Sequence, residues 1–177
     1  AFQSNLRLND IGYFIPVPLI KRFIQDQRDG QYDGVPEIGI QTSSLLNRYQ
    51  RKSLGLSDES GGVLVERIIP RSSAEGILEE GDVLLGVAGK SIDRAGMVHF
   101  GEHRVDFFIE AEHLQVGDSL FFKVWRNRSL LNLQITLKPP PFSAELRNAY
   151  DILPEYLIIG GLVLISLNRD YLQSEGK

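Results

Sequence analysis

The sequence contains no cysteine among its 177 residues, which excludes disulfides, thiolate metal sites and a cysteine nucleophile. This absence is compatible with the periplasm, the cytosol or an organelle. A concentrated positive charge is also missing, because 19 Lys and Arg residues are scattered among 23 Asp and Glu residues. Nucleic-acid-binding proteins need a basic face, so we expect no nucleic-acid partner.

A long hydrophobic run is absent as well. The most apolar stretch, 156–167, has about 12 residues, whereas a membrane-spanning helix needs about 20. We therefore predict no membrane span and interpret this stretch as a buried strand with a bend at Gly160-Gly161. The first residues show neither an initiator Met nor a signal-peptide pattern, which indicates a chain cut from a longer protein.

Alternating strand and helix signals run through the rest of the sequence. Periodicity and turn residues predict strands over 11–15, 62–69, 83–87, 120–125 and 130–137. The same criteria predict helices over 18–28, 44–54 and 104–114, with one or two helical turns over 73–78. Lys138-Pro139-Pro140-Pro141 is typical of a stiff linker.

The order of short motifs between 37 and 137 carries the functional signal. Ile38-Gly39-Ile40 begins a strand, and a later strand ends at Pro70. Gly81-Asp82 then precedes an apolar run, and Gly117-Asp118 leads into the final hairpin. Each motif is common by itself, but the whole series in this order is specific.

This series resembles a PDZ domain in the strand order used by the Deg/HtrA family of trypsin-like serine proteases. The resemblance implies a mainly β fold with helices (α+β): a PDZ-type, partly open β-sandwich or barrel of five to six strands with two main helices. It also implies three segments. Residues 1–28 would be the C-terminal end of a protease domain with its connecting helix, 29–138 the PDZ domain, and 139–177 a linker and the truncated start of a second PDZ-like domain.

By this resemblance, the backbone of Glu37, Ile38, Gly39 and Ile40 forms a loop that binds a peptide carboxylate. A nest of convergent N–H groups binds anions, and a peptide can then add a strand to an open sheet edge. The rest of the groove is expected to comprise Gln41 on the strand and four residues on the facing helix: Arg104, Phe107, Phe108 and Ala111. Glu37 and nearby Asp33 are like-charged with a carboxylate and would weaken its binding.

Two other patterns imitate functional sites. Asp58-Glu59-Ser60-Gly61-Gly62 resembles the nucleophile loop of a trypsin-like protease, but all three histidines follow Ser60, whereas that fold places its histidine first. A Gly-rich turn is the favoured interpretation. His99, Glu102 and His103 lack the His-Glu-x-x-His order of a zinc site, so a surface role is favoured over a metal site.

The resulting hypothesis is a peptide-binding PDZ module of a Deg/HtrA-type serine endopeptidase that captures substrate or regulates the protease. No catalytic residue, cofactor or metal is predicted in this chain, since the parent's triad would lie upstream. The expected partners are C-terminal or unfolded peptide segments, the parent's own protease domain and further copies in a homo-oligomer. The alternative is a structural module whose groove is occupied in cis or by a neighbouring subunit. The family resemblance favours the periplasm or cell envelope.

Overall fold

The computed structural model describes residues 2–4, 12–30, 33–141 and 155–165. Its elements, in chain order, are β1 (Phe2–Ser4), β2 (Gly12–Phe14), α1 (Val17–Asp26), the 3-10 helix η1 (Gln27–Asp29), β3 (Ile40–Ser44), α2 (Arg48–Ser53), β4 (Val63–Ile68), β5 (Val83–Val87), β6 (Lys90–Ser91), β7 (Met97–Phe100), β8 (His103–Asp106), α3 (Ile109–Glu112), β9 (Ser119–Arg126), β10 (Ser129–Thr136), β11 (Tyr156–Ile159) and β12 (Leu162–Ile165).

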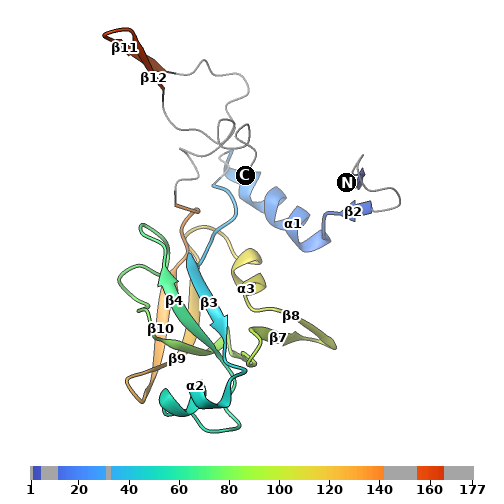
Figure 1. Ribbon diagram of the computed structural model, residues 1–177. Coiled ribbons are helices and arrows are strands. Elements are labelled where there is room, and N and C mark those ends of the chain that lie inside the picture. The colour runs from blue at the N-terminus through green and yellow to red at the C-terminus, as the bar shows by residue number, and fades with distance from the viewer. Residues whose placement is uncertain (1, 5–11, 31–32, 142–154, 166–177) are drawn as a thin grey trace. The chain divides into compact units, whose positions relative to one another are not determined.

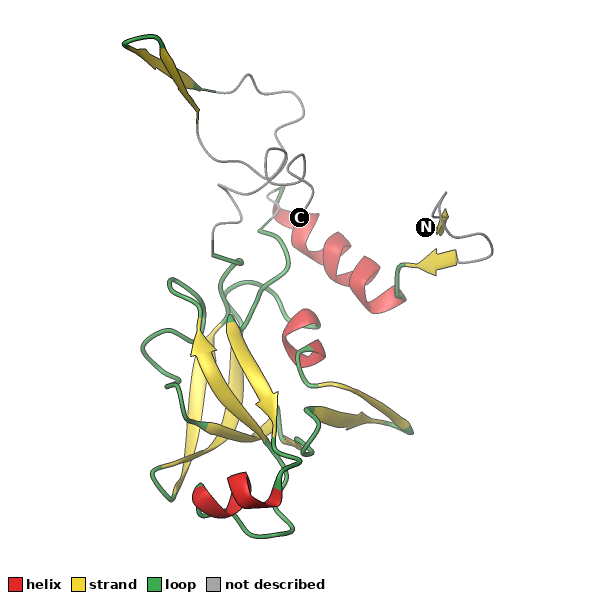
Figure 2. Cartoon of the chain, viewed as in Figure 1, coloured by secondary structure: helices red, strands yellow, loops and turns green. Residues whose placement is uncertain are grey.

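The main sheet has six strands in the order β10-β9-β5-β4-β3, with β6 paired to β5 (Figure 1). All its pairings are antiparallel. β3 therefore lies at one edge, beside β4 alone among the described strands. The predicted mainly β fold with short helices is confirmed, and Figure 2 shows the small share of helix.

One main hydrophobic core holds the sheet and α3 together. β3 contributes Ile40, α3 contributes Ala111, and the segment before α3 contributes Phe107, which is 1% exposed. A smaller cluster at the α2 end contains Leu45, Leu56 and Val83, with Trp125 packed against it. The indole N–H of Trp125 donates to the Leu54 carbonyl at 3.0 Å, so this tryptophan is a packing residue.

The helix predicted over 104–114 is wrong in its first half. Residues 103–106 form β8, which pairs with β7, and the described helix α3 begins only at Ile109. The Asp106 carboxylate accepts the Phe108 N–H at 3.0 Å, a local bond that competes with helix formation.

The single buried strand predicted over 156–167 is also wrong. β11 and β12 form a hairpin, and Gly160 and Gly161 both have positive φ, 56° and 83°, as a two-residue hairpin turn requires. Their eight apolar side chains are between 51% and 67% exposed. By backbone proximity the chain divides into two units, Ala1–Pro139 and Pro140–Lys177, and the hairpin belongs to the second.

Asp93 fastens the β7–β8 hairpin to the main sheet. Its carboxylate accepts the N–H groups of Ala95 at 2.8 Å and Met97 at 2.9 Å, and forms an ion pair with Arg104. Burial raises the pKa of Asp93, but the hydrogen bonds from Met97, Arg104 and Ala95 outweigh it and hold that pKa below its ordinary value. The charged carboxylate is thus the form that the fold favours.

We expect the Asp93 carboxylate to make stability depend on pH in the acid range. A group with a lowered folded pKa stabilises the fold above its unfolded pKa and loses that contribution as pH falls through the folded value. The loss should begin below about pH 4. Urea unfolding of the wild type and of the Asp93→Asn variant between about pH 7 and about pH 2.5 measures it. The variant should show a flatter profile, and identical profiles would contradict this account.

Candidate functional site

The segment leading into β3 is held by three carbonyl contacts in succession. The Glu37 carbonyl accepts the hydroxyl of Ser73. The Ile38 carbonyl accepts the Ala74 N–H at 3.1 Å, and the Gly39 carbonyl accepts the Ile69 N–H at 2.9 Å. All three donors belong to the segment 69–74 that follows β4, so the three carbonyls point to one side of the chain.

This anchoring turns the next three N–H groups outward. In a trans peptide the C=O and the following N–H point in opposite directions, and the described backbone has no cis bond. The N–H groups of Ile38, Gly39 and Ile40 therefore face away from the segment 69–74. Those of Ile38 and Gly39 form no hydrogen bond with any described residue. Three successive free amides make an anion-binding nest.

Gly39 is required by both conformation and space. Its φ of +77° is a region that other residues rarely occupy. A Cβ at this position would lie 2.1 Å from Ser72 Cβ and 2.7 Å from Ser72 Oγ, and Ser72 is fully buried. The loop therefore packs directly on Ser72, an arrangement that only glycine permits.

The outer edge of β3 is open along its length. No strand in the described part of the chain pairs with that edge, and the first contact occurs beyond it, where the Leu45 N–H donates to the Arg94 carbonyl at 2.9 Å. Open edges present unpaired N–H and C=O groups to another chain. The amide nest and the edge are continuous, since Ile40 belongs to both.

The structure places the other predicted groove residues in different settings. Gln41 is exposed on β3, and Phe108 is half-buried against the main core. Phe107 and Ala111 are 1% and 3% exposed, so they can support a groove only from beneath. Arg104 lies on β8 in its ion pair with Asp93. The roles of these residues in peptide binding stay predictions.

Lys138 is a neighbour of this site that sequence reasoning missed. The Glu37 N–H donates to the Lys138 carbonyl at 3.1 Å, and the two residues form an isolated antiparallel bridge. The Lys138 N–H donates to Ser73 Oγ at 2.8 Å. The sequence interpretation considered Arg28 as an offset for Glu37, whereas the fold brings Lys138 from 101 residues further along the chain.

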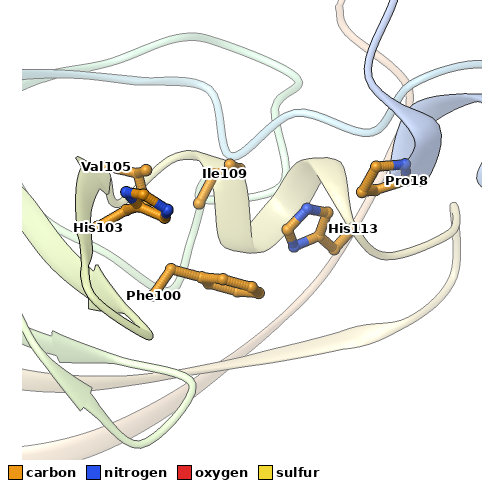
Figure 3. A pocket seen from close by; sticks show the side chains of 6 residues that line it. All are labelled: Pro18, Phe100, His103, Val105, Ile109 and His113. Atoms are coloured by element: carbon orange, nitrogen blue, oxygen red, sulfur yellow. The ribbon is translucent and has the colours of Figure 1, made fainter.

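A second concave site lies on another side of α3. Figure 3 shows Ile109 and His113 of α3 facing the β7–β8 hairpin, and these residues line an apolar cavity of about 430 Å³. Its remaining lining residues are Pro18, Phe100, His103 and Val105. The His113 and Phe100 rings are 5.4 Å apart. The two histidines belong to no group of three metal-binding side chains among the described residues.

The glycines of the loop that imitates a protease nucleophile have a packing role. A Cβ on Gly61 would lie 2.4 Å from the Ile92 carbonyl oxygen, so close backbone packing requires this glycine. The Ser60 hydroxyl lies 2.8 Å from the Ser57 hydroxyl, and its carbonyl accepts a bond from Arg94 at 3.1 Å. These contacts are those of a fixed turn.

Curated proteins with related sequences all carry Do-like names. The mitochondrial Do-like 11 protein of Arabidopsis thaliana is 33% identical over 168 residues, which cover 94% of this chain and 30% of the relative. Protease Do-like 4, mitochondrial, from the same plant is 29% identical over 177 residues, which cover 98% of this chain and 34% of the relative. The chain is homologous to the Deg/HtrA proteases. It spans about a third of the length of these relatives.

Structural comparison agrees with this relationship. A solved structure of the HtrA-type protease AlgWS227A with a decapeptide matches with a TM-score of 0.52 and 24% identity, covering 81% of this chain and 41% of that chain. The six-stranded sheet with β3 at its edge is the PDZ fold of this family. No protein-family profile matches the chain.

The names of the Deg/HtrA relatives differ from the compartment that the family resemblance favoured. Do-like 4 is named mitochondrial, and Do-like 2, which is 29% identical over 183 residues, is named chloroplastic. These are organelles of the plant cell, not the periplasm. Among the described residues, no helix is both long and apolar enough to cross a membrane.

Proposed function

We propose that this chain is a peptide-binding PDZ module of a Deg/HtrA-type serine endopeptidase. The observation that carries the proposal is the outward direction of three consecutive N–H groups, Ile38 to Ile40, at an unpaired sheet edge. The nest receives the ligand's carboxylate, and the ligand's main chain extends β3 as an added strand. An HtrA-type protease of the same fold holds a decapeptide, which suggests the class of ligand.

The surrounding segments support a place within a longer protein. Residues 1–28 form the end of a protease domain and its connecting helix, 29–138 the PDZ domain, and 139–177 the linker and the start of a second PDZ-like domain. In α1, Ile20, Phe23 and Ile24 are 37% to 56% exposed, which is suited to packing against the parent's protease domain. The parent acts in an organelle, as its named relatives do.

Peptide titration tests the proposal. Fluorescein-labelled heptapeptides ending in Ala, Val, Leu, Ile or Phe provide probes with one free carboxylate and an apolar terminal side chain. We expect saturable, micromolar binding of at least one of them by fluorescence anisotropy. Versions N-methylated at alternate positions are the matched controls, since they lose the main-chain donors that strand addition needs. Equal binding of both versions, or binding of neither, would refute strand addition.

The structural alternative predicts another result. If the groove is filled by a neighbouring subunit, the chain should assemble with rising concentration and bind none of the peptides. The exposed apolar β11–β12 hairpin is the observation that favours this alternative. Sedimentation velocity across a hundredfold concentration range separates the two.

A further inference from the structure

We infer that Lys138 is the cation of the carboxylate site and makes it selective for a free peptide C-terminus over an internal segment. This inference rests on the proposed function and deepens it. Glu37 alone would repel a carboxylate, and the sequence interpretation therefore favoured internal segments. The position of Lys138 reverses that expectation.

The main chain holds Lys138 at the start of the carboxylate loop. Its carbonyl accepts the Glu37 N–H, and its N–H donates to the Ser73 hydroxyl, which in turn donates to the Glu37 carbonyl. Ser73 is 2% exposed, so this closed set of bonds is shielded from water. The backbone of Lys138 is thus fixed against the loop whatever its side chain does.

The side chain of Lys138 remains available to a ligand. The residue is exposed, and its ammonium forms no ion pair with any described carboxylate. Its one described contact is a long bond of 3.5 Å from Nζ to the Ser72 carbonyl. Ser72 is the residue that packs on Gly39, which keeps the ammonium next to the amide nest. A weakly held, flexible cation beside free N–H groups suits an incoming carboxylate.

Glu37 and Lys138 then act as opposed charges on the same site. Both are exposed, and they share the backbone bridge, so each lies near the bound carboxylate. Glu37 lowers the affinity that Lys138 raises, and the balance decides how strongly a terminal carboxylate is preferred. Both effects should weaken as salt increases, because exposed charges are screened.

The test compares each peptide with its C-terminal amide. For the wild type we expect the free carboxylate to bind about ten-fold more tightly than the amide. Lys138→Gln should reduce that ratio about three-fold and Lys138→Glu about ten-fold, with little change for the amide. Glu37→Gln should raise the ratio. Lys123→Glu, an equal charge change on exposed β9, is the matched control and should leave the ratio unchanged.

The outcomes separate the two levels of proposal. If the wild type binds neither peptide form, the proposed function fails. If it binds both forms and Lys138→Glu leaves their ratio unchanged, peptide binding stands and the role of Lys138 is wrong. Because the bonds at 138 are main-chain bonds, the variants should keep the wild-type Tm, and a ratio that changes only together with a lowered Tm also overturns the inference.

Discussion

Replacing Gly39 with alanine is expected to abolish peptide binding and to cost the domain about 3 kcal/mol of its free energy of unfolding. A non-glycine residue at this positive φ costs about 1 to 2 kcal/mol. The new Cβ would also overlap Ser72 Cβ at 2.1 Å, and overpacking a buried site adds about 1 to 3 kcal/mol. Relief of the overlap would shift the carbonyls of the loop and with them the N–H groups of the nest.

Gly89 provides a matched control. It has the same φ, +77°, but no atom lies within 4 Å of its Cβ position. Gly89→Ala should therefore show only the cost of conformation, with peptide binding unchanged. Adding Ser72→Gly to the Gly39→Ala variant should restore part of the stability, since the overlapping atoms are removed. Urea unfolding and anisotropy measure both effects, and equal losses at positions 39 and 89 would contradict the packing account.

Truncating Arg126 to alanine should destabilise the domain by about 3 to 4 kcal/mol. Its guanidinium holds Asp82 with two bonds, at 2.6 and 2.7 Å, and also contacts Glu79 at 2.6 Å. Asp82 is 1% exposed, so its carboxylate would be left buried and unpaired, the situation in which losing one partner is most costly. The hydrogen bonds to Asp82 also raise the pKa of Arg126, which therefore stays charged.

Two further variants identify the cause of that loss. Arg126→Lys keeps the charge but lacks the planar fork, so an intermediate loss is expected. Arg48→Ala removes an ion pair with Asp58 in which both side chains are more than half exposed, and it should cost less than about 1 kcal/mol. Urea midpoints of the three variants give the comparison. Similar losses for Arg126→Ala and Arg48→Ala would show that burial of Asp82 does not determine the effect.

The parts of the fold that the sequence predicts are those with local signals. Ile38-Gly39-Ile40 marks the loop because only glycine takes that backbone form, and Gly81-Asp82 marks the turn before β5. The apolar runs of β4, β5 and β9 alternate or are fully buried, which makes them recognisable within a few residues. These features together were sufficient to indicate the PDZ fold.

The parts that the sequence does not predict depend on distant partners. Residues 103–106 look helical by period, yet pairing with β7 and the bond from Arg104 to Asp93 make them a strand. Lys138 lies 101 residues from Glu37 along the chain, so no window of sequence places them together. Phe107 and Ala111 have the right period for a groove wall, but period alone does not distinguish a helix face on the core from one on the groove.

The most direct test of the account is the state of three backbone amides before and after ligand binding. Amide hydrogen exchange by NMR, with and without a saturating heptapeptide, reports whether the N–H groups of Ile38, Gly39 and Ile40 are paired. Our account predicts rapid exchange in the free chain and strong protection in the complex. Protection already present in the free chain, or rapid exchange that persists under saturation, would contradict it.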